Sequence, residues 1–219
     1  MKTLELFKGT GSFSKIMEEE GNECITLDIL EKYKPTICCD IMEFDYKQFK
    51  PGEFDIIWCS PECKIFSSLQ YTHIKNPNGD TKKKKWDSRE HLEEERKKHH
   101  KFFHKTIEII SYLKPKKYFV ENPKYSAIWK IPDIKYDTLQ DPKFITCCYC
   151  QFGYSYKKPT QFLTNVDKSD VLCKCKKHSK MLGINSKEIT KKLDIQPEAL
   201  SLEERYSNPP DLIKYLCDN

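Results

Sequence analysis

The first two-thirds of the chain alternates between two hydrophobic patterns. Short apolar runs bounded by turn residues indicate buried strands, whereas apolar residues spaced three and four apart indicate helices. Strands that alternate with helices are typical of βαβ units and a parallel sheet. The expected strands are residues 3–7, 24–28, 36–40, 54–59, 117–121, 144–150 and 161–166, and the expected helices are residues 13–20 and 88–113.

The C-terminal part has a different sequence pattern. After residue 166 come the motif "CKCKKH" and two short helical patterns around residues 184–193 and 210–216. No internal repeat or clean linker divides the chain, and 219 residues suffice for one domain with a full core. We therefore expect an α/β fold with a mostly parallel twisted sheet and helices on both faces. Residues 1–166 would form the main domain, and residues 167–219 a small region packed on it.

Charge and composition narrow the function only a little. The net charge is +5, and three of the 38 basic residues are arginines, which leaves 38 − 3 = 35 lysines. This excess fits a nucleic-acid partner without requiring one. No apolar run reaches membrane-spanning length, and the N-terminus lacks the pattern of a signal peptide. We expect an intracellular protein of cytoplasm or nucleus that is neither secreted nor bound to a membrane.

A glycine-containing turn follows the first expected strand, in "LELFKGTGSFSK". Gly9 and Gly11 allow a tight turn and a close approach to a ligand, and the following helix offers free N–H groups. Acids also end the first three strands: Glu5, Asp28 and Asp40. Their common position predicts an adenosine-type ligand at the carboxyl edge of the sheet. The alternative is that these acids only cap helices and form turns.

A cysteine and a glutamate end the next two strands. Cys63 lies in "FDIIWCSPECKIFSS" and Glu121 in "KKYFVENPK". In an open parallel sheet both side chains would emerge at the same edge as the glycine turn. A thiolate beside a carboxylic acid suits covalent attack on an electron-poor ring, with the acid protonating the ring. The alternative is an inert thiol and a helix-capping glutamate.

These residues resemble the motifs of a known family. "ELFKGTGSFSK", "LDI", "CDI", "SPECKIFS" and "FVENP", in that order, resemble the DNA cytosine-5 methyltransferases, especially the short orphan forms of large DNA viruses and phages. "YCQFGYSYKKPTQFLTN" is similar to the family's late basic motif, and "NPPDLIKYL" loosely resembles its C-terminal cofactor segment. The resemblance covers residues 4–166 and is weak afterwards. It implies a Rossmann-like methyltransferase fold dependent on S-adenosyl-L-methionine, acting inside a host cell if the gene is viral.

The resemblance also implies roles for individual residues. Cys63 would add to C6 of cytosine, and Glu121 would hydrogen-bond the ring at N3 and the exocyclic amine. A base inside a duplex is stacked, so the expected partner is double-stranded DNA with a flipped cytosine, bound by a monomer. The implied contacts to S-adenosyl-L-methionine are Phe7, Gly9, Gly11, Ser12, Asp28, Ile29, Asp40 and Ile41, and those to DNA are Ser67, Arg89, Lys157 and Lys158.

Three features depart from the family pattern. Glu62 stands where the family has a proline, and a carboxylate beside a thiol raises the thiol's pKa. Lys157 and Lys158 replace arginines, which removes the bidentate fork. Only about 50 residues follow the last expected strand, where sequence-specific relatives carry a larger region, so we expect a short recognition sequence or little specificity.

Two alternatives use the same fold. One is a catalytically weak or inactive DNA-binding relative, which Glu62 and the lysine replacements suggest. The other is a cytosine-5 methyltransferase of RNA, tRNA in particular, because the base chemistry is identical and no motif reads a 2′-hydroxyl. Methylation of the adenine amine is disfavoured, since that chemistry stacks the base on an aromatic residue where this chain has Cys63.

Two groups of cysteines raise the question of a metal. The motifs "CCYC" and "CKCKKH" bring five of the eleven cysteines and one histidine into two short segments. Four such residues could hold zinc in a tetrahedral site, but the spacing C-x-C-x-x-H is not that of a standard finger. Reduced thiols are therefore favoured over zinc. If a metal binds, the expected ligands are Cys150, Cys173, Cys175 and His178.

Overall fold

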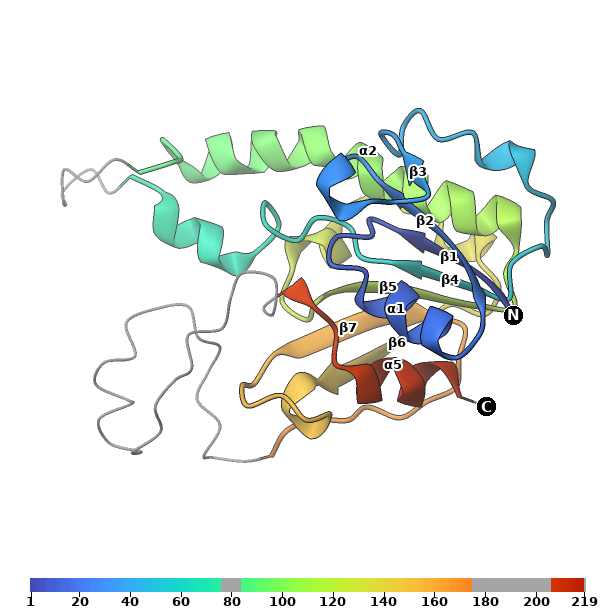
Figure 1. The fold of residues 1–219 in the computed structure, drawn as a ribbon. Helices are drawn as coiled ribbons and strands as arrows, with labels where there is room; N and C mark the ends of the chain where they lie inside the picture. The colour runs from blue at the N-terminus through green and yellow to red at the C-terminus, as the bar shows by residue number, and fades with distance from the viewer. Residues whose placement is uncertain (76–83, 175–205, 219) are drawn as a thin grey trace.

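One seven-stranded sheet organises the protein (Figure 1). The computed structural model describes residues 1–75, 84–174 and 206–218. The strand order is β3-β2-β1-β4-β5-β7-β6, with β1 to β5 parallel and β7 antiparallel to both of its neighbours. The mostly parallel sheet is therefore confirmed. The strands are β1 Lys2–Leu6, β2 Glu23–Asp28, β3 Ile37–Cys38, β4 Ile56–Cys59, β5 Lys117–Pro123, β6 Lys143–Cys148 and β7 Pro159–Thr164.

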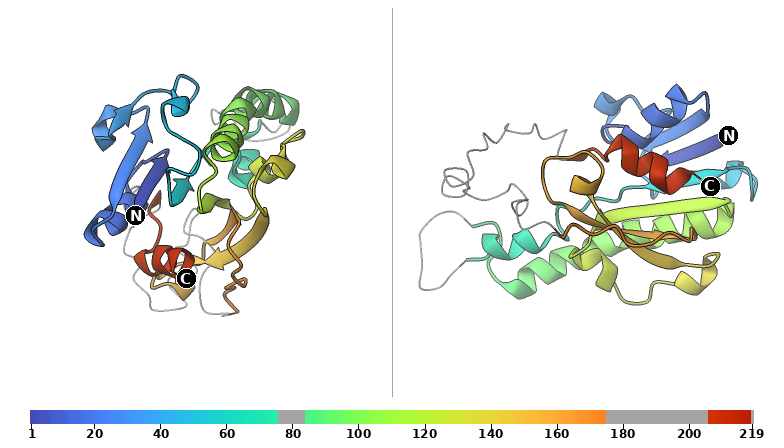
Figure 2. Two further views of the ribbon diagram at one scale, coloured as in Figure 1. Left: turned by 90° about the vertical axis from the view of Figure 1, so that its right-hand side faces the viewer. Right: turned by 90° about the horizontal axis from the view of Figure 1, so that it is seen from below.

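Helices cover both faces of the sheet, as the sequence predicted (Figures 1 and 2). Helix α2, Arg89–Leu113, packs on one face, whereas α1, Ser12–Glu19, and α5, Pro210–Cys217, pack side by side on the other. The described residues also contain short 3-10 helices at Glu31–Tyr33, Tyr46–Gln48, Ser68–His73, Ala127–Lys130, Tyr136–Thr138 and Tyr149–Gln151.

The central strand β4 is buried on both of its faces. Ile57 and Cys59 belong to the core beneath α2, and Ile56 and Trp58 to the core beneath α1 and α5. The Trp58 ring stacks on Phe13 of α1 with their centroids 5.1 Å apart. Burial on two faces explains why this strand is a continuous apolar run in the sequence.

Helix α2 begins and ends at clear local signals. The Ser88 hydroxyl accepts a hydrogen bond from the backbone N–H of His91, and Lys114 ends the helix in a left-handed conformation. The helix thus starts one residue after the predicted boundary. Its apolar face, including Phe103, Ile107 and Ile110, lies in the core as the helical spacing indicated.

Several boundaries differ from expectation. Strand β3 has two residues instead of five, so Asp40 lies in the turn that follows it. Strand β6 ends at Cys148, where the chain turns into the 3-10 helix Tyr149–Gln151. The helical pattern at residues 184–193 lies outside the described residues, and the division at residue 166 stays a prediction. Within the described ranges no helix has the length and apolarity needed to cross a bilayer.

Candidate active site

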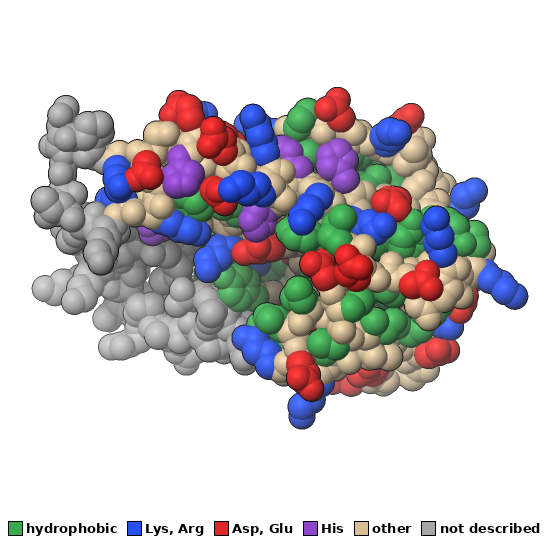
Figure 3. All heavy atoms as spheres, turned by 90° about the horizontal axis from the view of Figure 1, so that it is seen from above, with side chains coloured by type: hydrophobic (Ala, Val, Ile, Leu, Met, Phe, Trp, Pro, Cys, Tyr) green, Lys and Arg blue, Asp and Glu red, His purple; other side chains and the backbone are tan. Residues whose placement is uncertain are grey.

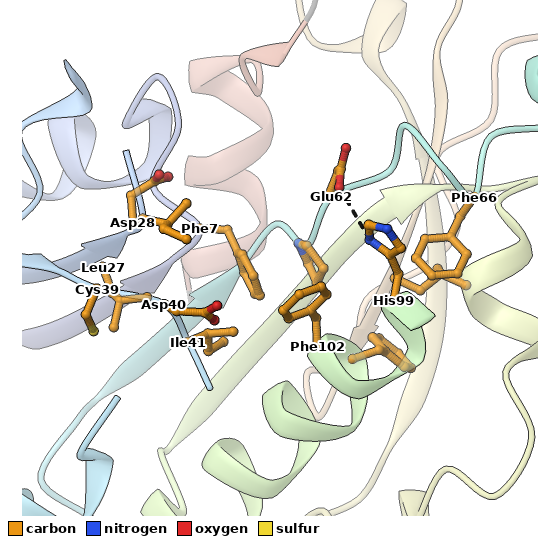
Figure 4. Close-up of a pocket in the computed structure, with 14 residues that line it drawn as sticks. Phe7, Leu27, Asp28, Cys39, Asp40, Ile41, Glu62, Phe66, His99 and Phe102 are labelled. Atoms are coloured by element: carbon orange, nitrogen blue, oxygen red, sulfur yellow. Dashed lines mark ion pairs between the residues drawn. The ribbon is translucent and has the colours of Figure 1, made fainter. Parts of the chain in front are cut away.

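A pocket opens at the carboxyl edge of the parallel strands (Figure 4). Its empty space, counted with the mouth that is open to solvent, is about 690 Å³. Carboxylates lie toward one end of it, and an acid–imidazole pair lies toward the other. Its walls are formed by Phe7, Leu27, Asp28, Ile29, Cys39, Asp40, Ile41, Pro61, Glu62, Phe66, His99, Phe102, Phe103 and Ile128.

Asp28 joins the pocket to the glycine turn. One oxygen of its carboxylate accepts a hydrogen bond from Gly9 N at 2.9 Å, and the other accepts one from Leu30 N at 2.8 Å. Gly11 has a φ of 66°, and a Cβ there would lie 3.0 Å from Lys8 Cε. The buried Asp28 therefore holds the turn in shape as well as lining the pocket.

Of the eight residues expected to bind the cofactor, five line the pocket: Phe7, Asp28, Ile29, Asp40 and Ile41. Gly9, Gly11 and Ser12 instead shape the turn beside it. Asp40 also accepts a hydrogen bond from Met42 N at 2.9 Å, so its alternative interpretation as a turn former holds too.

Glu5 does not belong to this group of acids. Its side chain lies beneath α1, where it accepts a hydrogen bond from Ser14 N at 3.3 Å. Burial raises the pKa of this carboxyl to about 7. Successive residues of a strand face opposite sides, so Glu5 points to the face opposite Leu4 and Leu6.

Cys63 follows β4 at the sheet edge, next to the tip of β5. Strands β4 and β5 pair as far as Cys59 and Val120. Beyond that point the Asn122 side chain donates a hydrogen bond to Pro61 O at 2.9 Å, which fixes the turn before Cys63 against β5. Burial, followed by the charge of Glu121, raises the pKa of the Cys63 thiol to about 11. The structure thus brings Cys63 and Glu121 together, as their strand-end positions predicted.

Glu121 lies at the centre of a buried polar group. Burial raises the pKa of its carboxyl, whereas Lys158 and hydrogen bonds from Tyr149 and Ser60 lower it. The Tyr149 hydroxyl lies 3.4 Å from Glu121 Oε1, and Lys158 Nζ lies 4.4 Å from the centroid of the Tyr149 ring. Lys158 also lowers the pKa of Cys63. One lysine therefore acts electrostatically on both the thiol and the acid.

A chain of hydrogen bonds connects this group to the C-terminal segment. Tyr149 also hydrogen-bonds Asn208 Oδ1, and Asn208 N donates to Ser12 Oγ at 3.1 Å. Asn208 is fully enclosed, at 4% exposure. Sequence reasoning placed Ser12 at the cofactor and quoted the motifs that begin at Tyr149 and Asn208, but it gave these two residues no role of their own.

The loop after Cys63 is anchored by Arg96, which sequence reasoning also missed. The Arg96 guanidinium is 2% exposed and donates to Ile65 O at 3.0 Å and to Ser67 O at 3.1 Å. It also bonds the Tyr71 hydroxyl at 2.9 Å and pairs with Glu93 at 2.7 Å. Its only sequence signal is that arginine is rare in this lysine-rich chain.

We expect Arg96→Met to lower the free energy of unfolding by about 2–5 kcal/mol, because the change leaves buried carbonyls without donors. Urea denaturation measures the loss, and amide exchange in residues 65–71 shows whether the loop opens. Arg89→Met is the matched control, because Arg89 starts the same helix on the surface. Equal destabilisation by both changes would contradict this role.

The residues expected to contact DNA occupy two places. Ser67 caps the 3-10 helix Ser68–His73 by accepting from Leu69 N, and Arg89 lies over the Tyr71 ring at 5.2 Å. Lys158 lies beside Tyr149, and Lys157 precedes it, partly buried. Ser67 and Arg89 therefore share one neighbourhood with Tyr71, and the lysines another with Glu121.

The cysteine clusters meet only in part within the described residues. Cys148 Sγ lies 3.4 Å from Cys150 Sγ, and Cys173 is buried nearby as a partner of Cys150. Among residues 1–75, 84–174 and 206–218, no group of three or more His, Cys, Asp or Glu side chains is arranged to hold a metal. Cys175 and His178 lie outside the described residues, so the expected zinc ligands stay a prediction.

The sheet order and the pocket at its carboxyl edge define a Rossmann-like methyltransferase fold. A methyltransferase of Entamoeba histolytica, EhMeth, superposes with a TM-score of 0.51 at 18% identity, over 82% of this chain and 57% of that one. A DNMT2 mutant of Spodoptera frugiperda gives a TM-score of 0.48 at 18% identity, over 80% and 55%. This chain thus spans a little over half the length of these two.

Sequence similarity identifies the family. A protein of Frog virus 3 (isolate Goorha), named "Probable DNA (cytosine-5)-methyltransferase", is 35% identical in an alignment of 175 positions that covers 76% of this chain and 72% of the viral one. No family model matches the sequence. The chain belongs to the DNA (cytosine-5)-methyltransferase family, and the resemblance of its motifs is confirmed.

Proposed function

We propose that this protein transfers a methyl group from S-adenosyl-L-methionine to C5 of cytosine in double-stranded DNA, through a covalent bond between Cys63 and C6. The observation that carries the proposal is the placement of Cys63 and Glu121 on neighbouring strand tips, both under the influence of Lys158. Pro61 and Glu62, which precede Cys63, line the pocket that we assign to the cofactor. The name of the viral relative supports DNA as the substrate.

The pocket fits an adenosine. Phe7 and Ile41 offer apolar surfaces for the ring, and the carboxylates of Asp28 and Asp40 offer acceptors for hydroxyl and amino groups. S-adenosyl-L-methionine bound there would supply an electrophilic methyl group.

The side chains of the protein would make the cytosine reactive. The Cys63 thiol first gives its proton to water, and the thiolate then adds to C6. The C5=C6 electrons shift to form C4=C5, and the C4=N3 electrons take the proton of Glu121 at N3. After C5 has taken the methyl group, water takes the C5 proton, the C5=C6 double bond re-forms and the Cys63 thiolate is expelled, while Glu121 regains the N3 proton. Burial of Glu121 favours its protonated form, which this role requires.

The cytosine must leave the base stack to reach Cys63, at a cost of a few kcal/mol. Lys158, whose charge acts on Glu121, would hold the flipped base. Ser67, Arg89 and Lys157 would contact the DNA around it. The protein would act as a monomer.

The direct test is incubation with isotopically labelled S-adenosyl-L-methionine and a cytosine-containing duplex, followed by mass spectrometry of the nucleosides. We expect labelled 5-methylcytosine from DNA and at least tenfold less from RNA of the same sequence. Preferential labelling of tRNA would identify RNA, and not DNA, as the substrate. The absence of labelled cytosine from every substrate would overturn the proposal.

We expect Asp28→Asn to weaken binding of S-adenosyl-L-methionine about tenfold to a hundredfold, because a hydrogen bond to a charged group contributes roughly 1.5–3 kcal/mol. Isothermal titration calorimetry measures the dissociation constant, and a thermal melt checks that the glycine turn survives. Asp167→Asn is the control, since the Asp167 side chain is 95% exposed. Unchanged binding in a folded Asp28→Asn protein would contradict the assignment of the pocket.

A further inference from the structure

The far end of the pocket holds an acid and an imidazole that face each other (Figure 4). Glu62 Oε2 lies 3.7 Å from His99 Nδ1. Glu62 immediately precedes Cys63, whereas His99 lies on α2, 37 positions after Glu62. Figure 3 shows that histidines gather among lysines and acids on the α2 face. Only one of the four on this helix, His99, lines the pocket.

The position of His99 is fixed by its surroundings. The His99 and Phe102 rings pack edge to face with their centroids 5.7 Å apart. One helical turn earlier, Arg96 donates a hydrogen bond to Ile65 O in the loop after Cys63. The Nδ1 atom is buried and lacks a hydrogen-bond partner among the described residues, although the side chain as a whole is 32% exposed. A buried ring nitrogen needs a partner, and the Glu62 carboxylate is the acid in reach of it.

The Glu62 carboxylate has little effect on the neighbouring thiol in this arrangement. Burial and Glu121 are the main causes that raise the pKa of Cys63, and Glu62 contributes least of the groups that act on it. A carboxylate on the adjacent residue could come much closer to the sulfur if it turned inward. Glu62 lines the pocket and Cys63 does not, so the Glu62 carboxylate lies on the pocket wall, facing His99.

We propose that His99 is a positioning residue, which holds the Glu62 carboxylate against the cofactor pocket and so preserves the nucleophilicity of Cys63. The inference rests on the proposed function, in which Cys63 is the nucleophile. It explains how the chain tolerates an acid where its family has a proline, because α2 supplies the compensating imidazole.

Other charged groups also lie near Cys63 and His99. Cys63 is faced by Glu121 on β5 and by Lys158 ahead of β7. His99 is one of the groups that lower the pKa of Glu95 on the same helix. Asp28 and Asp40 line the same pocket as His99. None of these groups changes in the variants below, so the comparison isolates the Glu62–His99 pair.

The test is the rate at which iodoacetamide alkylates Cys63, followed by mass spectrometry of the Cys63 peptide between pH 7 and 10 without DNA or cofactor. His99→Phe keeps an aromatic ring beside Phe102 but cannot form an ion pair with Glu62. We expect it to slow alkylation at pH 7.5 about threefold to tenfold, because a carboxylate that approaches the thiol raises its pKa. His99→Asn, whose amide can donate in place of Nδ1, should restore at least half of the wild-type rate.

The double variant decides the mechanism. In a protein that carries Glu62→Gln, His99→Phe should change the alkylation rate of Cys63 less than twofold, because residue 62 then has no carboxylate that could approach the thiol. His104→Phe, an exposed change on the same helix, should have no effect in either background. The proposal would be overturned if His99→Phe slowed the alkylation of Cys63 equally with and without Glu62→Gln, or did not slow it at all. Because alkylation needs no methyl transfer, this outcome is distinct from a failure of the proposed function.

Discussion

Cys63→Ala is expected to reduce 5-methylcytosine formation to the level of a reaction without protein. Without sulfur no bond to C6 forms, and C5 of cytosine stays too electron-poor to be methylated. Nucleoside mass spectrometry after a long incubation measures the residual activity. DNA that contains 5-fluorocytosine gives a second readout, because the wild-type protein should remain covalently attached to it and the variant should not.

The control for this change is Cys38→Ala, which removes an exposed thiol at the end of β3 that lies outside the pocket lining. It should retain wild-type activity. A Cys63→Ala protein that still methylates DNA at more than about 1% of the wild-type rate would exclude the covalent mechanism. Binding of S-adenosyl-L-methionine should persist in both variants, because neither residue lines the pocket.

Glu121→Gln is expected to lower the rate of methyl transfer about a hundredfold to ten-thousandfold, the usual contribution of a positioned general acid. The amide keeps the size of the side chain and its contact with Tyr149, but it has no proton to give to N3. Single-turnover kinetics with preformed complexes measures the chemical step. Glu94→Gln, an exposed change on α2, is the matched control.

The same variant has a predictable pH dependence. Burial raises the pKa of Glu121 above its unfolded value, so the folded protein holds this proton more tightly than the unfolded chain. Its stabilising contribution is complete below the unfolded pKa and is lost as the pH rises through the folded pKa. Between pH 5 and pH 9, the wild-type protein should therefore lose more unfolding free energy than Glu121→Gln does. Parallel losses in both proteins would show that Glu121 is ionised in the fold.

Local patterns were enough to predict the sheet and the acids and thiol at its edge. Asp28 ends β2, Cys63 follows β4 and Glu121 lies near the end of β5, and in a parallel sheet such positions bring them to one edge. The same reasoning failed for Glu5, because a residue near the end of a strand can face either side of the sheet. Its side chain lies under α1 and not at the pocket.

The supporting residues could not be predicted because their contacts are distant in sequence. Arg96 reaches Ile65 across 31 positions, and Asn208 reaches Ser12 across 196. The segment "HLEEERKKHH" reads as a solvated helix face, yet it supplies the buried Arg96 and the pocket residue His99. Periodicity identifies which face of a helix is apolar, but it does not show where a single charged side chain turns inward.

The bond between Ser12 and Asn208 has a consequence for synthesis on the ribosome. A nascent chain can form β1 to β5 early, but the tyrosine that contacts Glu121 gains its second partner only when residue 208 has left the exit tunnel. We therefore expect nascent chains in which residue 208 is still inside the tunnel to be inert.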